Sequence, residues 1–496
     1  MERNGRKIVI VGGGIAGLCA AVYALKCGYQ AEVLEMHDMA GGLAMSWRRG
    51  AYTFETCLHW FMGSNPASSM HSQWREVFDI DRLTFVDNDE FVRIETEAGE
   101  TLSIFTDVDR LEAGMLRRAP QDAAQIRRFT AAIRRLRTFR MPDPSRGLIG
   151  NLSALLRDLP SLPLLRELSR MSGAEYGARF TDPLIRSFFG SGDMGRLSAV
   201  AMIFSLAWMS AHDAGYAIGG AQAIVRLIEE RIASLGGRVR FNAKVERILV
   251  ENGAAVGVEL AGGEIVKADW VISAADGYAT LNQLLGGKYT SAEMEKLYRE
   301  AEIFPSYLQV SLGVGMDLHG QPPALTVLLD HPILVDPGAE LPLLSFRIFH
   351  FDPTFAPAGK TAVTCFLPTR NYEFWAGLRE ADPAAYRAEK QRVAEGVIGV
   401  LEKKLPGLRQ AIEVTDVSTP ATIIRYTGNW KGSMEGWLLK PGGRFRPYPN
   451  TVPGLRNFLM VGQWISPGGG LPSGPITARP AIETICKQDR VAFTPR

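Results

Sequence analysis

Cysteine is scarce in the chain, and the few cysteines present exclude several kinds of site. The 496 residues contain five, scattered and without a C-x-x-C pair: Cys19, Cys27, Cys57, Cys365 and Cys486. An odd, dispersed set predicts reduced thiols rather than a disulfide framework, a zinc site or a dithiol redox centre. H-E-x-x-H and G-x-S-x-G elements are also missing. We therefore expect no metal site and no nucleophile elbow.

Charge of either sign is not in excess, and long hydrophobic runs are absent. The chain carries 55 Lys and Arg against 53 Asp and Glu, and the net charge of +2 gives no reason to expect a nucleic-acid partner. No apolar run reaches the roughly 20 residues of a spanning helix, and we expect no signal peptide. These features, with 46% hydrophobic residues, predict a cytoplasmic protein of two or three packed units. Attachment to a membrane surface stays open.

The strongest positive signal is a nucleotide-binding motif near the start. Residues 7–35 read KIVIVGGGIAGLCAAVYALKCGYQAEVLE. This pattern predicts a buried strand over residues 7–11, a G-x-G-x-x-G turn, a helix to about residue 27, and a second strand over residues 31–34. The two strands and the helix form the context in which this glycine pattern indicates a dinucleotide site.

Each conspicuous residue of this motif has a physical task. Gly12 permits a turn too tight for a Cβ atom, Gly14 lets the backbone approach a pyrophosphate, and Gly17 lets helix and strand pack closely. The pyrophosphate would lie on free N–H groups at the positive end of the helix. Glu35, at the end of the second strand, can accept hydrogen bonds from an adenosine ribose.

A second glycine loop follows, and here the sequence resembles a known family. Residues 37–63 read HDMAGGLAMSWRRGAYTFETCLHWFMG, with Gly41 and Gly42 close behind the first motif. The nucleotide motif, the acid, the Gly-Gly loop and the later His-Trp pair resemble the phytoene desaturase-like flavoproteins. This group includes carotenoid desaturases, carotenoid isomerases and retinol saturases. The resemblance implies FAD rather than NAD, with the loop over residues 41–47 near its phosphates and ribityl chain.

Two later blocks extend the resemblance. Residues 219–276 predict an amphipathic helix over 223–235 and five strands, and the resemblance places Val245 against the adenine. Residues 457–485 read NFLMVGQWISPGGGLPSGPITARPAIETI, in which a glycine loop precedes a helix. In the family this loop meets the flavin pyrimidine edge, where positive potential favours the reduced anion. Two departures are Gln463, where relatives often carry Asp or Ala, and Pro480 inside the expected helix.

The predicted fold is mixed α/β, with two domains. A Rossmann-like FAD-binding domain, as in GR2-type flavoproteins, is expected from residues 1–63, 219–276 and 452–496. A substrate-binding domain is expected from residues 64–218 and 277–451. It would contain helices and an antiparallel sheet, because four strand-like runs recur between residues 306 and 369.

A basic, proline-broken region within the second part could face a membrane. Residues 115–175 contain a run of arginines followed by apolar segments: Arg117, Arg118, Arg127, Arg128, Arg134, Arg135, Arg137, Arg140 and Arg146. Such a region could rest on anionic lipid. The alternative is an arginine-rich helix face in solvent beside a core-packing neighbour.

By resemblance, the chain is expected to be an FAD-dependent oxidoreductase acting on an apolar isoprenoid or polyene. Hydride would move between a substrate carbon and flavin N5, in desaturation or saturation, with His59 handling the second proton and Tyr426 as a weaker second candidate. The alternative for both His59 and Tyr426 is a purely structural role, as a packed and hydrogen-bonded side chain. The electron partner is not indicated. The expected cofactor contacts are Gly12, Gly14, Ile15, Ala16, Gly17, Glu35, Met36, Gly41, Gly42, Leu43, Trp47, His59, Trp60, Val245, Ala275, Gly462, Gln463, Gly469, Gly470, Leu471 and Pro472.

Two other functions stay open. A redox-neutral cis–trans isomerase of a polyene would need the same FAD beside the same kind of substrate. A lipid-binding escort without catalysis, like the Rab GDP-dissociation inhibitors that share this architecture, would need none. Glu35 and both glycine loops favour a bound FAD over the escort. Amine oxidation is less favoured, because we identify no paired aromatics and flavin-facing lysine.

Overall fold

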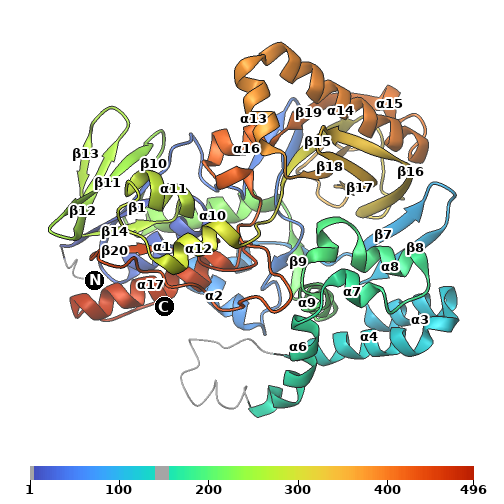
Figure 1. The fold of residues 1–496 in the computed structure, drawn as a ribbon, viewed down its shortest axis with the longest axis horizontal. Coiled ribbons are helices and arrows are strands. Elements are labelled where there is room, and N and C mark those ends of the chain that lie inside the picture. Colours follow the sequence, from blue (N-terminus) through green and yellow to red (C-terminus); the bar gives the residue numbers. More distant parts are fainter. Residues whose placement is uncertain (1–4, 140–155, 496) are drawn as a thin grey trace.

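A five-stranded parallel sheet is built from distant parts of the chain (Figure 1). The computed structural model describes residues 5–139 and 156–495. The strand order is β10-β2-β1-β14-β20, and every pair is parallel. The strands are β1 (Lys7–Val11), β2 (Gln30–Leu34), β10 (Arg238–Arg240), β14 (Trp270–Ser273) and β20 (Phe458–Met460). Two of them, β1 and β14, are rich in buried Val and Ile, as expected for parallel strands covered on both faces.

Three helices pack around this sheet and bring their chain ends to one side of it. They are α1 (Ile15–Lys26), α10 (Gly220–Ser234) and α17 (Ser473–Asp489), and α1 contacts both of the others. All twelve residues of α1 are buried. A Cβ atom on Gly17 would lie 2.0 Å from the carbonyl oxygen of Gly12, and one on Gly474 would lie 2.7 Å from Ile15. These glycines therefore set how closely α1 approaches its own turn and α17.

A small antiparallel sheet and short helices adjoin the parallel sheet. The sheet consists of β11 (Val245–Glu251), β12 (Ala254–Leu260) and β13 (Ile265–Lys267). After β14 the chain forms α11 (Gly277–Ala279), a π-helical turn over Thr280–Leu284, and α12 (Ala292–Glu300). Asp276 is the N-cap of α11, and its side chain accepts a hydrogen bond from the backbone N–H of Ala279 at 2.8 Å.

The second principal sheet has seven strands in the order β19-β15-β18-β17-β16-β7-β8. Their bounds are β7 (Glu90–Thr96), β8 (Thr101–Phe105), β15 (Ser306–Val314), β16 (Ala324–Asp336), β17 (Ala339–Ile348), β18 (Thr361–Thr369) and β19 (Ile412–Ser418). All pairs are antiparallel except β16 with β7. The predicted fold class, a nucleotide-binding parallel sheet beside a separate, largely antiparallel one, is confirmed. The four predicted strands form the centre of a larger sheet, because β7, β8 and β19 join it from distant parts of the chain.

Helices cover one side of this sheet. They are α13 (Tyr372–Ala381), α14 (Pro383–Lys404), α15 (Leu408–Ala411) and α16 (Pro420–Thr427). Helix α14 carries many charged residues, but its inner face brings Val393, Val397 and Leu401 into the core against the sheet. It is therefore an amphipathic helix with only its outer face in solvent.

A helical region forms a third core. Its elements are α3 (Val108–Arg118), α4 (Ala123–Leu136), α6 (Leu162–Ser169), α7 (Gly173–Gly177), α8 (Pro183–Gly190) and α9 (Ala199–Ser210). Phe129, Tyr176, Phe180 and Phe189 pack as one aromatic cluster within it, with Phe180 and Phe189 stacked at 5.4 Å. Part of the predicted membrane-facing region, residues 140–155 with Arg140 and Arg146, lies outside the described residues.

Short elements connect these parts. A hairpin of β3 (Ser46–Arg49) and β4 (Tyr52–Glu55) follows the second glycine loop, and a three-stranded ribbon is formed by β5 (Phe61–Met62), β9 (Ala214–Ala217) and β6 (Phe85–Val86). Helix α2 (Ser69–Val77) packs against α1 and α17. Glu55 fastens the hairpin to α10 by accepting a hydrogen bond from the backbone N–H of Ala221 at 2.8 Å.

The contact at Gly17 gives a direct test of this packing. We expect Gly17→Ala to lower the free energy of unfolding by about 1–3 kcal/mol, because its Cβ has no room beside Gly12. The control is Gly399→Ala within α14, whose Cβ meets nothing within 4 Å and should stabilise by about 0.5–1 kcal/mol. Urea unfolding measures both. Equal effects of the two substitutions would contradict the close approach.

Candidate functional site

A large cavity is lined by residues from the parallel sheet, the seven-stranded sheet and the helical region. Its volume is about 1810 Å³. Pockets for one small ligand usually occupy roughly 300–1,000 Å³. The cavity therefore has room for a dinucleotide and a further large ligand together.

The first two glycine loops form one end of the cavity, which we call the nucleotide end (residues 12–16, 35–36 and 41–43). Gly12 has φ of +98°, and Gly41 and Gly42 have φ of +122° and +62°, so each turn uses conformations that favour glycine. A Cβ on Gly42 would lie 3.2 Å from the Cα of Gly14. The N–H of Gly41 donates to the carbonyl oxygen of Gly13 at 2.9 Å. Bare backbone of two loops thus meets at the start of α1.

Glu35 is fixed at the nucleotide end by main-chain donors. Its carboxylate accepts hydrogen bonds from the N–H of Gly13 at 2.6 Å and of His37 at 2.9 Å. Burial raises the pKa of Glu35, while these hydrogen bonds act in the opposite direction. The carboxylate is therefore held at the end of β2, the position at which a ribose can donate to it.

The C-terminal glycine loop (residues 468–470) borders the same cavity. Gly469 has φ of +52°, and a Cβ there would lie 2.3 Å from the carbonyl oxygen of Glu435. Helix α17 begins directly after this loop, and Leu471, Pro472 and Ser473 line the cavity. Pro480 lies inside α17, beyond the turn that faces the cavity. The N-termini of α1 and α17 therefore both face one space, an arrangement that suits an anionic ligand.

These features fit FAD. The glycine cradles leave room that side chains would fill, two helix N-termini supply donors for phosphate, and Glu35 supplies the acceptor for ribose. Nearly all the predicted cofactor contacts line the cavity: Gly12, Gly14, Ile15, Ala16, Glu35, Met36, Gly41, Gly42, Leu43, His59, Trp60, Val245, Ala275, Gly462, Gln463, Gly469, Gly470, Leu471 and Pro472. The structure thus brings together residues from the beginning, middle and end of the chain.

Two predicted contacts do not line it. Gly17 packs α1 against the turn at Gly12 instead, which is the task its motif position suggests. Trp47 lies in β3 and donates its indole N–H to Asp416 of β19 at 3.1 Å. The hairpin turns this side chain toward the second sheet, so the expected place of Trp47 beside the cofactor is not supported.

Tyr426 lines the cavity, but beside the nucleotide end. Its ring meets that of His37 edge-on at 4.6 Å, and the Arg425 guanidinium lies 4.2 Å above it. His37 follows Glu35 by two residues, so Tyr426 lies near the carboxylate that would accept from a ribose. This placement does not support a role for Tyr426 at a reacting carbon.

His59 lies on the cavity wall among substrate-domain side chains. Its ring meets Phe366 of β18 edge-on at 5.4 Å, and its carbonyl oxygen accepts a hydrogen bond from Arg347 of β17 at 3.1 Å. Burial, and then the nearby Arg347 guanidinium, lower the pKa of His59 to about 3. The imidazole is therefore neutral near pH 7, which makes it a poor donor or acceptor of a catalytic proton.

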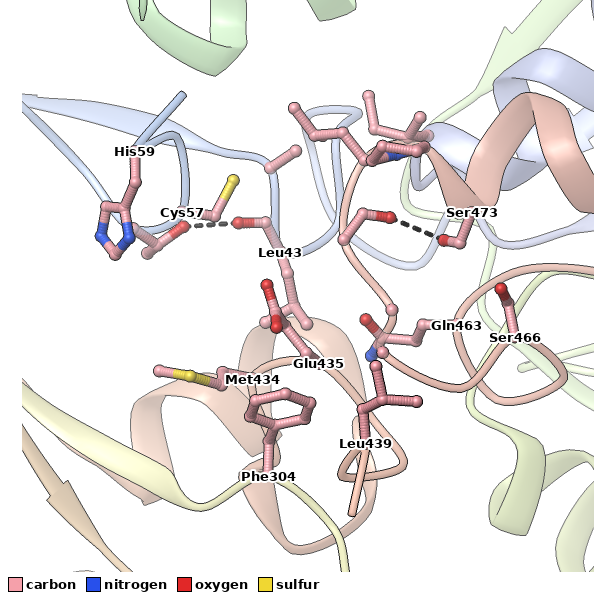
Figure 2. A pocket seen from close by; sticks show the side chains of 18 of the residues that line it. Leu43, Cys57, His59, Phe304, Met434, Glu435, Leu439, Gln463, Ser466 and Ser473 are labelled. Carbon is pink, nitrogen blue, oxygen red and sulfur yellow. Dashed lines mark hydrogen bonds between the residues drawn. The ribbon is translucent and has the colours of Figure 1, made fainter. Parts of the chain in front are cut away.

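Two charged residues on the cavity wall escaped sequence analysis. Arg347 faces the cavity from β17, and Glu435 faces it from the segment between α16 and the C-terminal loop (Figure 2). Burial lowers the pKa of Arg347 and raises that of Glu435 to about 7. Neither belongs to a motif. Only tertiary packing brings them to the cofactor cavity, and no local sequence signal marks them.

The end of the cavity away from the glycine loops is apolar. We call it the apolar end, and it is walled by side chains from α6, α8, α9 and the second sheet: Leu162, Leu165, Phe188, Val200, Phe204, Trp208, Leu325, Leu328, Leu343, Phe346 and Phe366. Large aromatic and aliphatic side chains of this kind suit a long apolar ligand.

Comparison with known proteins identifies relatives of the whole chain. The family model described as "Flavin containing amine oxidoreductase" matches residues 15–384. A neurosporene-forming phytoene desaturase from Cereibacter sphaeroides is 26% identical, over 94% of this chain and 92% of that protein. A chloroplastic prolycopene isomerase from Daucus carota is also 26% identical, over 90% of this chain and 72% of that protein.

Solved structures share the fold. An oxidoreductase from Methanosarcina mazei superimposes with a TM-score of 0.61 at 18% identity, covering 96% of this chain and 100% of that one. A variant of a putrescine oxidase gives a TM-score of 0.62 at 15% identity, covering 98% and 99%. At these identities the likeness concerns the fold alone.

The C-terminal glycine loop offers a test of cofactor binding. We expect Gly469→Ala to weaken FAD binding by about tenfold or more, because its Cβ would displace the loop from Glu435. Gly468→Ala is the matched control, since it carries the same positive-φ strain (φ +85°) but its Cβ lies 3.9 Å from its nearest neighbour. Titration of flavin-free protein with FAD, followed by fluorescence, measures both. Identical affinities in the two variants would count against the contact.

Proposed function

Because the chain belongs to the family of flavin-containing amine oxidoreductases, we propose that it is an FAD-dependent enzyme acting on carbon–carbon bonds of an apolar isoprenoid or polyene. The observation that carries the proposal is one continuous cavity. It joins a glycine-lined nucleotide end, with Glu35, to an apolar end with Phe188, Phe204 and Phe366. A flavin held by the first would expose its ring to a hydrocarbon held by the second.

In this proposal each group of residues around the cofactor binds a chemically different part of it. Gly12, Gly14 and the start of α1 hold the pyrophosphate, and Glu35 accepts from the ribose. The glycine loop at residues 468–470 and the N-terminus of α17 favour negative charge at the ring edge. Bound FAD supplies a two-electron acceptor or donor for hydride. The apolar walls exclude water and orient the substrate.

Desaturation is the main direction that we propose. The relatives include phytoene desaturases and prolycopene isomerases at 26% identity, so cis–trans isomerisation of a polyene is the second candidate. Amine oxidation suits the cavity less well. Beside a bound FAD, a small diamine would make little contact with the apolar end, whereas a large hydrocarbon would contact its apolar walls.

The division of labour along the chain is part of the proposal. We assign FAD binding to residues 1–63, 219–276 and 452–496, and substrate binding to residues 64–218 and 277–451. Support comes from the parallel sheet, whose strands all lie in the first set, and from the seven-stranded sheet, whose strands all lie in the second.

We also propose that the mouth of the apolar end rests on a membrane surface. Leu162 and Phe445 line the cavity and are 43% and 49% exposed, and Leu156 and Leu159 nearby are 59% and 44% exposed. An apolar substrate dissolved in lipid could enter between them. Among the described residues no helix is long and apolar enough to cross a membrane.

Charge gives this surface less support than the arginine count predicts. Arg118, Arg128 and Arg134 are ion-paired with Asp182, Glu167 and Glu112, among other partners. Paired charges attract anionic lipid weakly. The membrane proposal therefore rests mainly on the exposed leucines, and the remaining arginines add to it.

A single leucine tests the membrane proposal. We expect Leu159→Glu to reduce binding to phosphatidylglycerol-containing vesicles by about tenfold or more, because it removes an inserting apolar side chain and adds a repelling charge. Leu334→Glu on β16 is the control, since Leu334 is exposed to the same 44%. Vesicle co-sedimentation measures both. Equal loss in the two variants, or none in either, would argue against this surface.

Product mass tests the proposed reaction. Oxidised, FAD-loaded enzyme is incubated without oxygen with a panel of hydrocarbon polyenes, and we expect bleaching of the flavin with a product two hydrogens lighter. Reduced enzyme giving a heavier product would establish saturation, and unchanged mass with altered retention would establish isomerisation. If no polyene changes in mass or retention with either form, the proposed substrate class is wrong. A preparation that stays colourless with added FAD would favour the escort.

A further inference from the structure

Glu435 is an unpaired carboxyl group on the wall of the cavity. Figure 2 shows its side chain in the cavity, among the other labelled lining residues. The residue is half-buried, because its exposed part faces the cavity. Among the described residues it has no hydrogen-bond or ion-pair partner, and burial alone accounts for its shifted pKa. A carboxyl group that faces a cavity without a protein partner is free to interact with a ligand there.

The backbone fixes Glu435 beside the C-terminal glycine loop. A Cβ on Gly469 would lie 2.3 Å from the Glu435 carbonyl oxygen, and one on Gly470 would lie 3.9 Å from its Oε1. Ser433 and Gly436 brace the segment through a hydrogen bond from the Gly436 N–H to Ser433 Oγ at 3.2 Å. The carboxyl group therefore lies where the nucleotide end passes into the apolar end.

Glu435 acts electrostatically on two ionisable side chains, Cys57 and Tyr307, and neither competes with it for protons near neutrality. Burial raises the pKa of the Cys57 thiol and of the Tyr307 phenol, and the Glu435 charge adds to both effects. Both side chains are therefore neutral at pH 7. Burial raises the pKa of Glu435 itself to about 7, in the range where a group can both accept and release a proton.

We propose that Glu435, rather than His59, is the catalytic residue that exchanges a proton with the substrate. The assignment rests on the proposed redox function. His59 faces the same cavity but stays neutral, and Tyr426 lies against His37 near Glu35, so Glu435 is left at the junction where a reacting carbon would meet the flavin ring.

The step balances without a further oxidant. In desaturation one substrate carbon loses a hydride, with its electron pair, to FAD. The adjacent carbon loses a proton to the Glu435 carboxylate, and the electron pair of that C–H bond becomes the new C=C bond. In saturation the same transfers run in reverse, with the Glu435 carboxylic acid as proton donor.

The test compares wild type with Glu435→Gln, which keeps the shape but cannot accept the proton, and Glu435→Asp. Anaerobic reduction of the FAD-loaded enzyme by a polyene substrate is followed by flavin absorbance. We expect Glu435→Gln to slow it by about 100-fold or more, Glu435→Asp to retain part of the rate, and the control Glu251→Gln, exposed at the end of β11, to match wild type.

The pH dependence carries a definite sign. Because the base form is needed for desaturation, the wild-type reduction rate should rise with pH to a plateau, with a midpoint near pH 7. Glu435→Gln should lose this limb. For saturation the acid form is needed, and the rate should instead fall through the same pH.

A second readout does not depend on turnover. The absorption spectrum of the resting flavin should shift with pH in the wild type, because a charge develops beside the ring, and this shift should vanish in Glu435→Gln. Asp276 also lines the cavity, and burial raises its pKa to about 7. Only the difference between the two proteins is therefore assigned to Glu435.

The outcomes separate the two proposals. If Glu435→Gln is reduced at the wild-type rate, or if its spectrum titrates like that of wild type, Glu435 is not the proton-exchanging group, although the redox function stands. If no polyene reduces or reoxidises the wild-type flavin, the proposed function fails and the assignment of Glu435 falls with it.

Discussion

The structure depends on the approach of bare backbone at the start of two helices. Gly17 lets α1 pack against the turn at Gly12, and Gly474 lets α17 pack against Ile15. Only with both contacts do the two N-termini reach one cavity and add their dipoles at the same place. The contacts are specific because an added methyl group would collide with the Gly12 carbonyl oxygen at Gly17 and with the Ile15 side chain at Gly474.

Two carboxyl groups on the same cavity differ in their hydrogen bonding. Glu35 is buried but accepts two main-chain hydrogen bonds, so its place is a binding position with fixed geometry. Glu435 receives none from the described residues, and burial alone determines its pKa. Two carboxyl groups whose environments differ in this way take different tasks, one holding a ligand and the other moving a proton.

The parts that sequence could predict are those in which local pattern and task coincide. The glycine motif, Glu35 and the loop before α17 each occupy a short stretch whose spacing has one physical explanation. The resemblance places Trp47 near the cofactor, whereas β3 directs its indole toward Asp416. Tyr426 lies on α16 and lines the cavity beside His37. Glu435 and Arg347 could not be found, because only the packing of β17 and the segment after α16 brings them to the wall. For the same reason β7, β8 and β19 were not recognised as members of the second sheet.

Arg347 explains why one polar wall of the cavity can lie beside an apolar substrate. Its Nη2 donates a hydrogen bond to the carbonyl oxygen of His59. Its charge adds to the effect of burial, and both lower the pKa of the His59 imidazole. Burial, reinforced by the Arg347 charge, therefore leaves His59 as a flat, uncharged ring edge-on to Phe366. With His59 neutral, the titrating group at the junction of the two ends is Glu435. The shape of the walls would then orient an apolar substrate. The substrate would meet a proton-exchanging group only beside the glycine loop. The reaction would therefore be confined to the carbons nearest the flavin ring.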